Sequence, residues 1–221
     1  MRLLTGVSVI GDRYLAWGTD GLLVSSDGMD WTRARIGGRP RMPETTFITG
    51  ATVGGPGYIA FGQGGYASDG ETTAGVWTSP DGESWSRAPE QPSLEGVSSM
   101  TSVIRNDDGS LVGFGVGGAD YSVPVEWTST DGRTWTRVNH LSGEPQFPSV
   151  VRESHGFLAL GEGIWWSQDG ISWKKQSTPE DCAVWAVDNG PASYVAVGMP
   201  WPRSLNSRCL WTTADVGHGF R

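Results

Sequence analysis

Short apolar runs alternate with glycine-rich polar stretches along the whole chain, and no window keeps a helical period of apolar positions. One such run ends in glycine and recurs at near-regular intervals. Its copies are YLAWG (14–18), YIAFG (58–62), LVGFG (111–115), FLALG (157–161) and YVAVG (194–198). Short strands joined by turns produce this pattern, which predicts an all-β fold.

A second recurring segment combines a hydroxyl residue, an aspartate and an aromatic residue. Its copies are LLVSSDGMDW (22–31), VWTSPDGESW (76–85), VEWTSTDGRTW (125–135), IWWSQDGISW (164–173) and LWTTADVGHGF (210–220). The aligned aspartates are Asp27, Asp81, Asp131, Asp169 and Asp215, which lie 54, 50, 38 and 46 residues apart. Internal repeats of this length are typical of propeller blades.

Each repeat contains four strand-like pieces in a fixed order, which we call A to D. Strand A is an apolar run upstream, strand B ends in the glycine, strand C enters the aspartate segment, and strand D follows it. The repeats predict a five-bladed β-propeller with four-stranded antiparallel blades, built as one domain over residues 1–221. The approximate units are 1–38, 39–90, 91–140, 141–177 and 178–221. Because the chain ends at Arg221, either the last blade lacks strand D or the N-terminal residues supply it.

The aspartate segment is predicted to close the turn between strands C and D. Aspartate accepts hydrogen bonds from backbone N–H groups two residues on, and glycine supplies a positive φ. The aromatic residue is expected to pack between blades, as are the strand C tryptophans Trp77, Trp127, Trp165 and Trp211. The aromatic residues at the turn are Trp31, Trp85, Trp135 and Trp173, with Phe220 in the last unit. A structural role therefore explains the aspartates better than a catalytic one.

These segments resemble the Asp-box, or BNR, repeat, whose pattern is Ser/Thr-x-Asp-x-Gly-x-x-Trp. Four copies are one residue shorter, Ser-x-Asp-Gly-x-x-Trp, and the fifth fits the longer pattern with Phe220 in place of Trp. The resemblance covers essentially the whole chain and implies a β-propeller. It does not select a function, because the family includes sialidases, lectins and assembly factors.

Loops are where a propeller carries binding residues. The strand order places the A–B and C–D turns on one side of the propeller and the B–C and D–A loops on the other. Three B–C loops are long, at 63–74, 116–124 and 199–208, whereas those of units one and four are nearly absent. Their candidate ligand-binding residues are Tyr66, Glu71, Asp120, Tyr121, Trp201 and Arg203. This set suits stacking on a sugar or contact with a peptide, although the loops could also be ordinary insertions.

Net charge, the length of apolar runs and histidine spacing argue against several classes of partner and ligand. A net charge of −8 argues against nucleic acid, and no apolar run is long enough to span a membrane. The histidines His140, His155 and His218 lack metal-ligand spacing, and no nucleophile or phosphate-loop motif occurs. We therefore predict no metal, no cofactor and no catalytic residue.

These features favour a non-catalytic module that binds a protein or another ligand. A carbohydrate-binding lectin is one alternative. A sialidase-like glycoside hydrolase is another, and it would need an arginine triad for which Arg105 and Arg152 are the nearest inner candidates. Cys182 and Cys209 both fall in the last unit and could form a disulfide or remain free thiols. With the resemblance, they favour an extracellular or cell-envelope location, although residues 1–11 do not read as a signal peptide.

Overall fold

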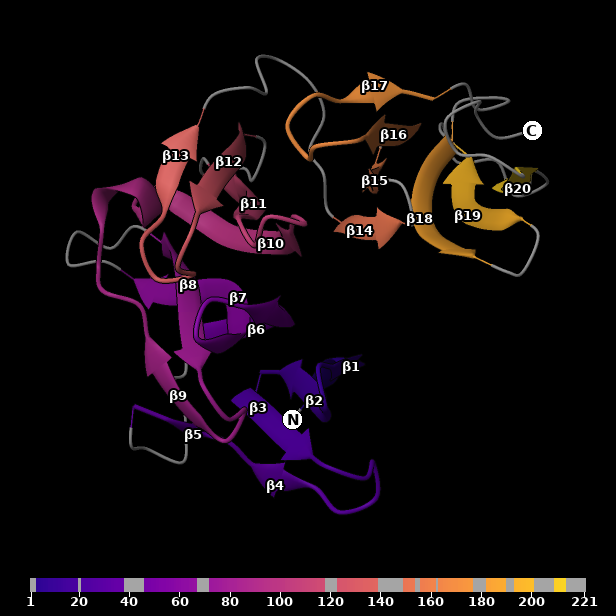
Figure 1. The fold of residues 1–221 in the computed structure, drawn as a ribbon. Helices are drawn as coiled ribbons and strands as arrows, with labels where there is room; N and C mark the ends of the chain where they lie inside the picture. Colours follow the sequence, from indigo (N-terminus) through magenta and orange to yellow (C-terminus); the bar gives the residue numbers. More distant parts are fainter. Residues whose placement is uncertain are drawn as a thin grey trace. The chain divides into compact units, whose positions relative to one another are not determined.

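The computed structural model describes residues 3–19, 21–37, 46–66, 72–117, 123–138, 149–153, 156–161, 163–176, 182–189, 193–200 and 209–213. These residues form β-strands, turns and one short 3₁₀ helix, η1 (Pro92–Leu94). The strands assemble into five successive sheets (Figure 1). The all-β prediction is confirmed.

Each sheet is an antiparallel meander in chain order, as expected of a propeller blade. Blade one contains β1 (Leu4–Ile10), β2 (Arg13–Gly18), β3 (Gly21–Ser25) and β4 (Thr32–Arg33). Blade two contains β6 (Thr46–Gly54), β7 (Gly57–Tyr66), β8 (Thr72–Ser79) and β9 (Ser84–Arg87). Blade three contains β10 (Val97–Arg105), β11 (Leu111–Gly117), β12 (Val123–Ser129) and β13 (Thr136–Val138).

Blades four and five complete the series. Blade four contains β14 (Ser149–Glu153), β15 (Gly156–Gly161), β16 (Gly163–Ser167) and β17 (Lys174–Lys175). Blade five contains β18 (Cys182–Asn189), β19 (Tyr194–Pro200) and β20 (Cys209–Thr213). Four blades thus have all four strands, and the last has three within the described residues.

The blades belong to two compact units. Blades one to three lie in Met1–Leu141, and blades four and five lie in Ser142–Arg221. The prediction of one domain over the whole chain remains a prediction.

The hydrophobic core lies between successive blades, not within a single sheet. Leu15 and Leu22 of blade one belong to one cluster with Trp77 of blade two. Phe61 of blade two belongs to a second cluster with Trp127 of blade three. In the C-terminal unit, Leu158, Leu160 and Ile164 of blade four cluster with Val184, Ala196 and Cys209 of blade five. Face-to-face packing buries the apolar side of each blade against the next.

The tryptophans differ in burial. Trp77, Trp85, Trp127 and Trp135 in blades two and three are buried. Trp31, Trp165 and Trp173 are half-buried. For these three rings the expected role in an inter-blade core remains a prediction. Trp211 lies in β20, and its side chain is outside the described part.

One strand departs from the meander order. β5 (Arg35–Ile36) follows blade one in the chain but pairs in parallel with β9, the outermost strand of blade two. The backbone N–H of Arg35 donates to the carbonyl of Glu83 at 2.8 Å, and that of Gly37 donates to Trp85 at 2.8 Å. The segment that leaves one blade thus covers the open edge of the next.

Candidate ligand-binding face

The serine and aspartate of each repeated segment form a closed hydrogen-bonded turn, as blade two illustrates. The Oδ1 atom of Asp81 accepts the backbone N–H groups of Glu83 and Ser84, both at 2.9 Å. The Ser79 hydroxyl donates to the same Oδ1 at 2.9 Å and accepts the N–H of Gly82 at 2.8 Å. Gly82 has φ 77°, in the left-handed region that favours glycine. The predicted turn chemistry is confirmed in this blade.

Three further blades build the same turn. The serine hydroxyl accepts the glycine N–H at 2.8 to 2.9 Å, and the tryptophan indole N–H donates to the glycine carbonyl at 3.1 to 3.2 Å. The serines are Ser25, Ser129 and Ser167, and the aspartates are Asp27, Asp131 and Asp169. Asp215 lies outside the described residues.

These bonds shift the acidity of the aspartates. The backbone N–H groups of Ser84 and Glu83 hold the pKa of Asp81 below its usual value, and those of Asp30 and Met29 do the same for Asp27. For Asp131 and Asp169, burial raises the pKa, but the hydrogen bonds outweigh it and the net shift is downward. All four are therefore ionised acceptors inside turns, which is a structural use of the carboxylate.

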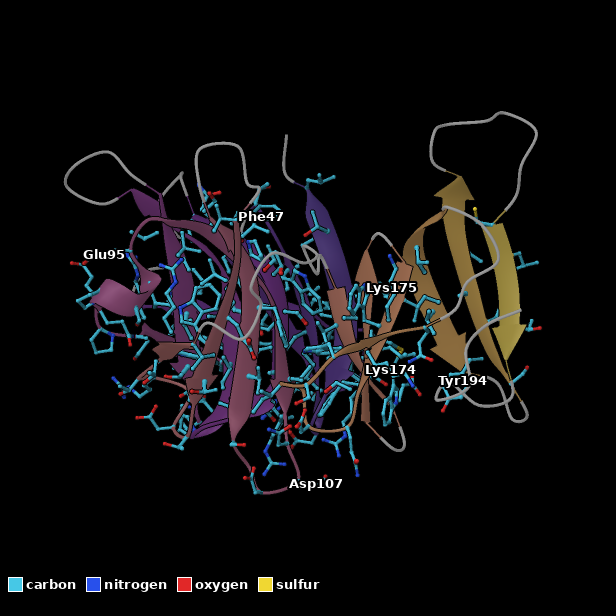
Figure 2. All side chains as sticks on the ribbon, turned by 90° about the horizontal axis from the view of Figure 1, so that it is seen from above. Phe47, Glu95, Asp107, Lys174, Lys175 and Tyr194 are labelled. Carbon is cyan, nitrogen blue, oxygen red and sulfur yellow. The ribbon has the colours of Figure 1, made fainter. Side chains whose placement is uncertain are left out.

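The two ends of the strands carry different connections. In Figure 2, Asp107 in the A–B turn of blade three lies at the lower end of the N-terminal unit, and Phe47 near the start of β6 lies at the upper end. The B–C connections leave from the upper end, because β7 ends and β8 begins there. We call this end the B–C face.

The length of the B–C connection differs sharply from blade to blade. In blades one and four the hairpins are tight, with Gly18 paired to Gly21 and Gly161 paired to Gly163. In the other three blades the paired ends lie farther apart in the chain, as the sequence predicted. These pairs are Tyr66 with Thr72, Gly117 with Val123, and Gly198 with Cys209.

Blade two contains more strand than expected. Much of the predicted loop at 63–74 is a β-hairpin, since β7 continues to Tyr66 and β8 begins at Thr72. A register shift between Gln63 and Tyr66 absorbs the glycine-rich stretch. Glycine suggested a loop, whereas here it permits an irregular strand to continue.

Most predicted ligand-binding residues lie beyond these strand ends. Glu71, Asp120, Tyr121, Trp201 and Arg203 are outside the described residues, as are Asp69 and the three histidines. Tyr66 is placed by its backbone at the end of β7. The structure therefore positions the strands that carry these loops, and the loop residues stay predictions.

Arg87 is a residue of this face that the sequence did not single out. It is exposed on β9, and its Nη2 atom donates to the Thr73 hydroxyl at 3.4 Å, close to the base of the blade two hairpin. No sequence signal distinguished it from the other short strand D tails. Its guanidinium adds a positive charge near the strand ends that the connection with Asp69 and Glu71 joins.

A repeated β-bulge shapes strand A near the B–C face. The pairing between strands A and B shifts by one residue between Leu4 and Gly6, between Ile48 and Gly50, and between Met100 and Ser102. The extra residues are Thr5, Thr49 and Thr101. Their hydroxyls donate to strand B carbonyls of Trp17, Phe61 and Phe114 at 3.4, 3.1 and 3.2 Å respectively.

In blades one to three, the glycine that ends the strand B run makes room for this bulge. A Cβ atom on Gly62 would overlap the carbonyl oxygen of Phe47, and one on Gly18 or Gly115 would overlap the equivalent carbonyl of its own blade. The recurring YIAFG-type segment therefore encodes a close approach between two backbones. The sequence signal for this close approach is the glycine that ends every YIAFG-type segment.

Carboxylates and arginines on strand A lie at the other end of the strands. Within the described first strands of the blades, the acidic residues are Glu153, the last residue of β14, and Asp188, the penultimate residue of β18. Arg105 and Arg152, the candidates for a sialidase-type triad, are also next to A–B turns. The Arg152 guanidinium lies 5.5 Å from the Phe157 ring centroid. These groups are displaced from the B–C face by the length of a strand.

A second group of ionisable residues joins blades one and two at the A–B end. The Tyr58 hydroxyl donates to the Asp12 carboxylate, and Arg13 lies 3.5 Å from Glu83 and 3.9 Å from Asp12. This hydrogen bond raises the pKa of Tyr58 and lowers that of Asp12. Tyr58 is buried, and its contact ties the A–B turn of one blade to strand B of the next. The arrangement serves packing between blades.

Three further observations concern the described residues alone. They contain no cluster of three histidine, cysteine, aspartate or glutamate side chains placed to hold a metal ion. Among them, no helix has the length and apolar character needed to cross a bilayer. Cys209 is disulfide-bonded, and the only other cysteine in the sequence is Cys182.

No profile of a known protein family matches the sequence, and a search of curated proteins found no relative. Solved structures show similarity of fold. An ancestral GH74 enzyme aligns with TM-score 0.62 and 12% identity over 99% of this chain and 30% of its own. A GH32 β-fructofuranosidase from Bombyx mori aligns with TM-score 0.51 and 13% identity over 98% of this chain and 61% of its own.

A GH43_1 enzyme from Xanthomonas citri, solved with xylose, aligns with TM-score 0.50 and 9% identity over 97% of this chain and 88% of its own. This chain thus spans about a third of the GH74 enzyme and less than two thirds of the β-fructofuranosidase. At these identities the comparisons establish the β-propeller fold.

Proposed function

We propose that this chain is a non-catalytic binding propeller that holds a carbohydrate at its B–C face. The observation that carries the proposal is the difference between blades at this end. One repeat builds every blade, yet blades two, three and five extend their B–C connections and blades one and four close theirs in tight turns. Departures from a repeat that all fall in the same connection of the blade mark the connection that carries function.

The carboxylates of the repeated aspartates are occupied by hydrogen bonds within the turns, and this favours a binding function over hydrolysis. Asp27, Asp81, Asp131 and Asp169 already accept two backbone N–H groups each and a serine hydroxyl. A role in proton transfer would require these turns to open. The aspartates are therefore best explained as the structural part of an Asp-box propeller, in line with the resemblance of the sequence.

Two arguments favour a carbohydrate as the ligand. Tyr66 is the last residue of β7, and the sequence puts Tyr121 and Trp201 in the two other long B–C connections. Aromatic rings stack well on the apolar faces of sugars. The Xanthomonas citri propeller of similar fold was solved with xylose and with xylotriose. A protein ligand at the same face is the alternative.

A glycoside hydrolase is the second candidate, favoured by the propeller glycosidases among the structures of similar fold. Such enzymes flank the scissile bond with two carboxylates. Glu71 and Asp120 are the acidic residues of the long B–C loops that could supply them. We also propose an exported location, because the disulfide at Cys209 suits an oxidising compartment.

The test is a screen of the purified chain on an array of neutral and sialylated oligosaccharides that includes xylotriose, with hydrolysis measured in parallel. We expect binding without hydrolysis, and loss of binding in Trp201→Ala. Release of reducing sugar would establish the hydrolase instead. If the chain neither bound nor hydrolysed any glycan, both carbohydrate proposals would be wrong, and a protein ligand would remain.

A further inference from the structure

The same two sides of the repeat meet where blades pack on one another. Between blades one and two, Leu15 and Leu22 of blade one share a cluster with Trp77 and Trp85 of blade two. We call the side of a blade that packs on the preceding blade its front side, and the opposite side its rear side. The same pairing of sides recurs in the cluster between blades two and three and in the cluster between blades four and five.

The front side of blade one is apolar and exposed. Strand pairing places Val7 in one row with Ala16 and Leu23, and directly paired residues lie on the same side of a sheet. The equivalent row of blade three contains Val103 and Trp127, which belong to the cluster with blade two. Val103 is 6% exposed, whereas Val7 is 63% exposed. The residue type is the same at both positions, and what differs is the blade that covers it.

Two further residues extend this exposed side. Leu4 pairs with Gly18 as Ile48 pairs with Gly62 in blade two, so the two apolar residues hold equivalent positions. Ile48 is buried in the cluster with blade one, whereas Leu4 is exposed. Trp31 at the C–D turn is half-buried, while the equivalent Trp85 is buried.

The rear side of blade five is the complementary surface. Val197 pairs with Leu210, as Leu160 pairs with Ile164 in blade four. Leu160 and Ile164 are buried in the cluster with the front side of blade five. In blade five, by contrast, Leu210 is 63% exposed, and Val195 and Val197 on the same side of the sheet are exposed too.

We propose that the front side of blade one binds the rear side of blade five in a second copy of this chain. Such a contact would repeat the interface that already joins blades one and two, two and three, and four and five. Grouped exposed apolar side chains mark surfaces of association. Because the two surfaces differ, the contact is head-to-tail and can close a dimer or extend into a longer assembly. The inference is independent of the proposed carbohydrate binding.

Two lysine variants test the contact from its two sides. Val7→Lys places a charge on the front side of blade one, and Leu210→Lys places one on the rear side of blade five. Both residues are exposed within their own chain, so the fold should tolerate both substitutions. Val123→Lys is the matched control, because Val123 in β12 of blade three is also an exposed valine and belongs to neither surface.

Sedimentation velocity between about 1 and about 100 µM measures the association of the full chain. We expect the wild type and Val123→Lys to form dimers or larger species at the upper end of this range. The dissociation constant should rise at least about tenfold in Val7→Lys and in Leu210→Lys. An equimolar mixture of these two variants should form mixed dimers, because the first keeps the rear side of blade five and the second keeps the front side of blade one.

Three results would overturn the proposal. A wild type that stays monomeric throughout the range would exclude the second copy as the partner. Undiminished self-association of Leu210→Lys would show that blade five does not supply the partner surface. A mixture of the two variants that stays monomeric, while the wild type associates, would show that the two surfaces do not bind each other.

A second measurement uses the wild-type chain alone. Hydroxyl-radical footprinting at low and high protein concentration reports which side chains association covers. Leu4, Val7 and Leu210 should become protected together as the concentration rises, and Val123 should stay reactive. Protection of one surface without the other would contradict a head-to-tail contact.

Discussion

The serine of the C–D turn should be a larger determinant of stability than its small size suggests. Ser79 is 0% exposed, and its hydroxyl accepts the N–H of Gly82, which is itself buried. In Ser79→Ala this N–H loses its partner at a site with no access to water. The carboxylate of Asp81 is exposed, so water replaces the hydroxyl that it loses.

The magnitude follows from this single buried donor. Leaving a buried N–H unsatisfied costs about 1–3 kcal/mol, and we expect Ser79→Ala to lower the free energy of unfolding by about 2 kcal/mol. Ser79→Thr, which has the residue found at position 213 of the last unit, should retain most of the stability. Ser86→Ala removes an exposed hydroxyl from β9 and is the matched control, expected within about 0.5 kcal/mol of the wild type.

Urea denaturation followed by tryptophan fluorescence and by far-ultraviolet circular dichroism measures these differences from the midpoint and the slope. The two probes also show whether the two compact units unfold together. A Ser79→Ala midpoint that matches Ser86→Ala would show that the hydroxyl does not stabilise the turn. The four serines of the C–D turns would then not stabilise their turns through this hydrogen bond.

The remaining predictions concern other contacts. Tyr58→Phe, which removes the hydroxyl donated to Asp12, should cost about 1 kcal/mol in urea denaturation, and an unchanged midpoint would contradict the inter-blade role of that bond. Gly62→Ala should cost more than about 2 kcal/mol because its Cβ meets backbone, and it should exceed Gly96→Ala, where only the positive φ of 63° resists. The folded pKa of Asp81 lies below its unfolded value of 3.8, so its stabilisation is present above about pH 4 and lost as the pH falls through the folded pKa. Wild type should therefore lose more stability than Asp81→Asn between about pH 6 and about pH 3, and parallel losses would refute the assignment. Reduction of the disulfide at Cys209 should lower the melting temperature reversibly, by the equivalent of about 2–4 kcal/mol, and a melting curve insensitive to reductant would contradict this.

Local chemistry made much of the fold predictable. The C–D turn is specified within one short segment, because the hydroxyl, carboxylate and glycine that close it are neighbours in the chain. The glycine that ends strand B signals the strand A bulge equally well, although the pairing that needs it could be recognised only once the strands were aligned. Repetition multiplied both signals.

Features that depend on distant partners were not predictable. The pairing of β5 with β9 joins segments from different repeats, and nothing in Arg35 or Ile36 marks it. The half-burial of Trp31 depends on which parts of the fold cover its ring, and the residues around it in the chain do not show this. The loop residues Trp201 and Tyr121 were selected by residue type and loop length, two criteria that do not determine where a side chain lies.

The parallel pairing of β5 has a consequence for synthesis of the chain. Arg35 leaves the ribosome 49 residues before Ser84, its partner in β9. Until then, the segment after blade one has no strand to join, whereas β9 meets β5 already synthesised when it emerges. Blades one and two therefore mature as a pair, and a nascent chain stalled between them would expose an edge open to pairing with other chains.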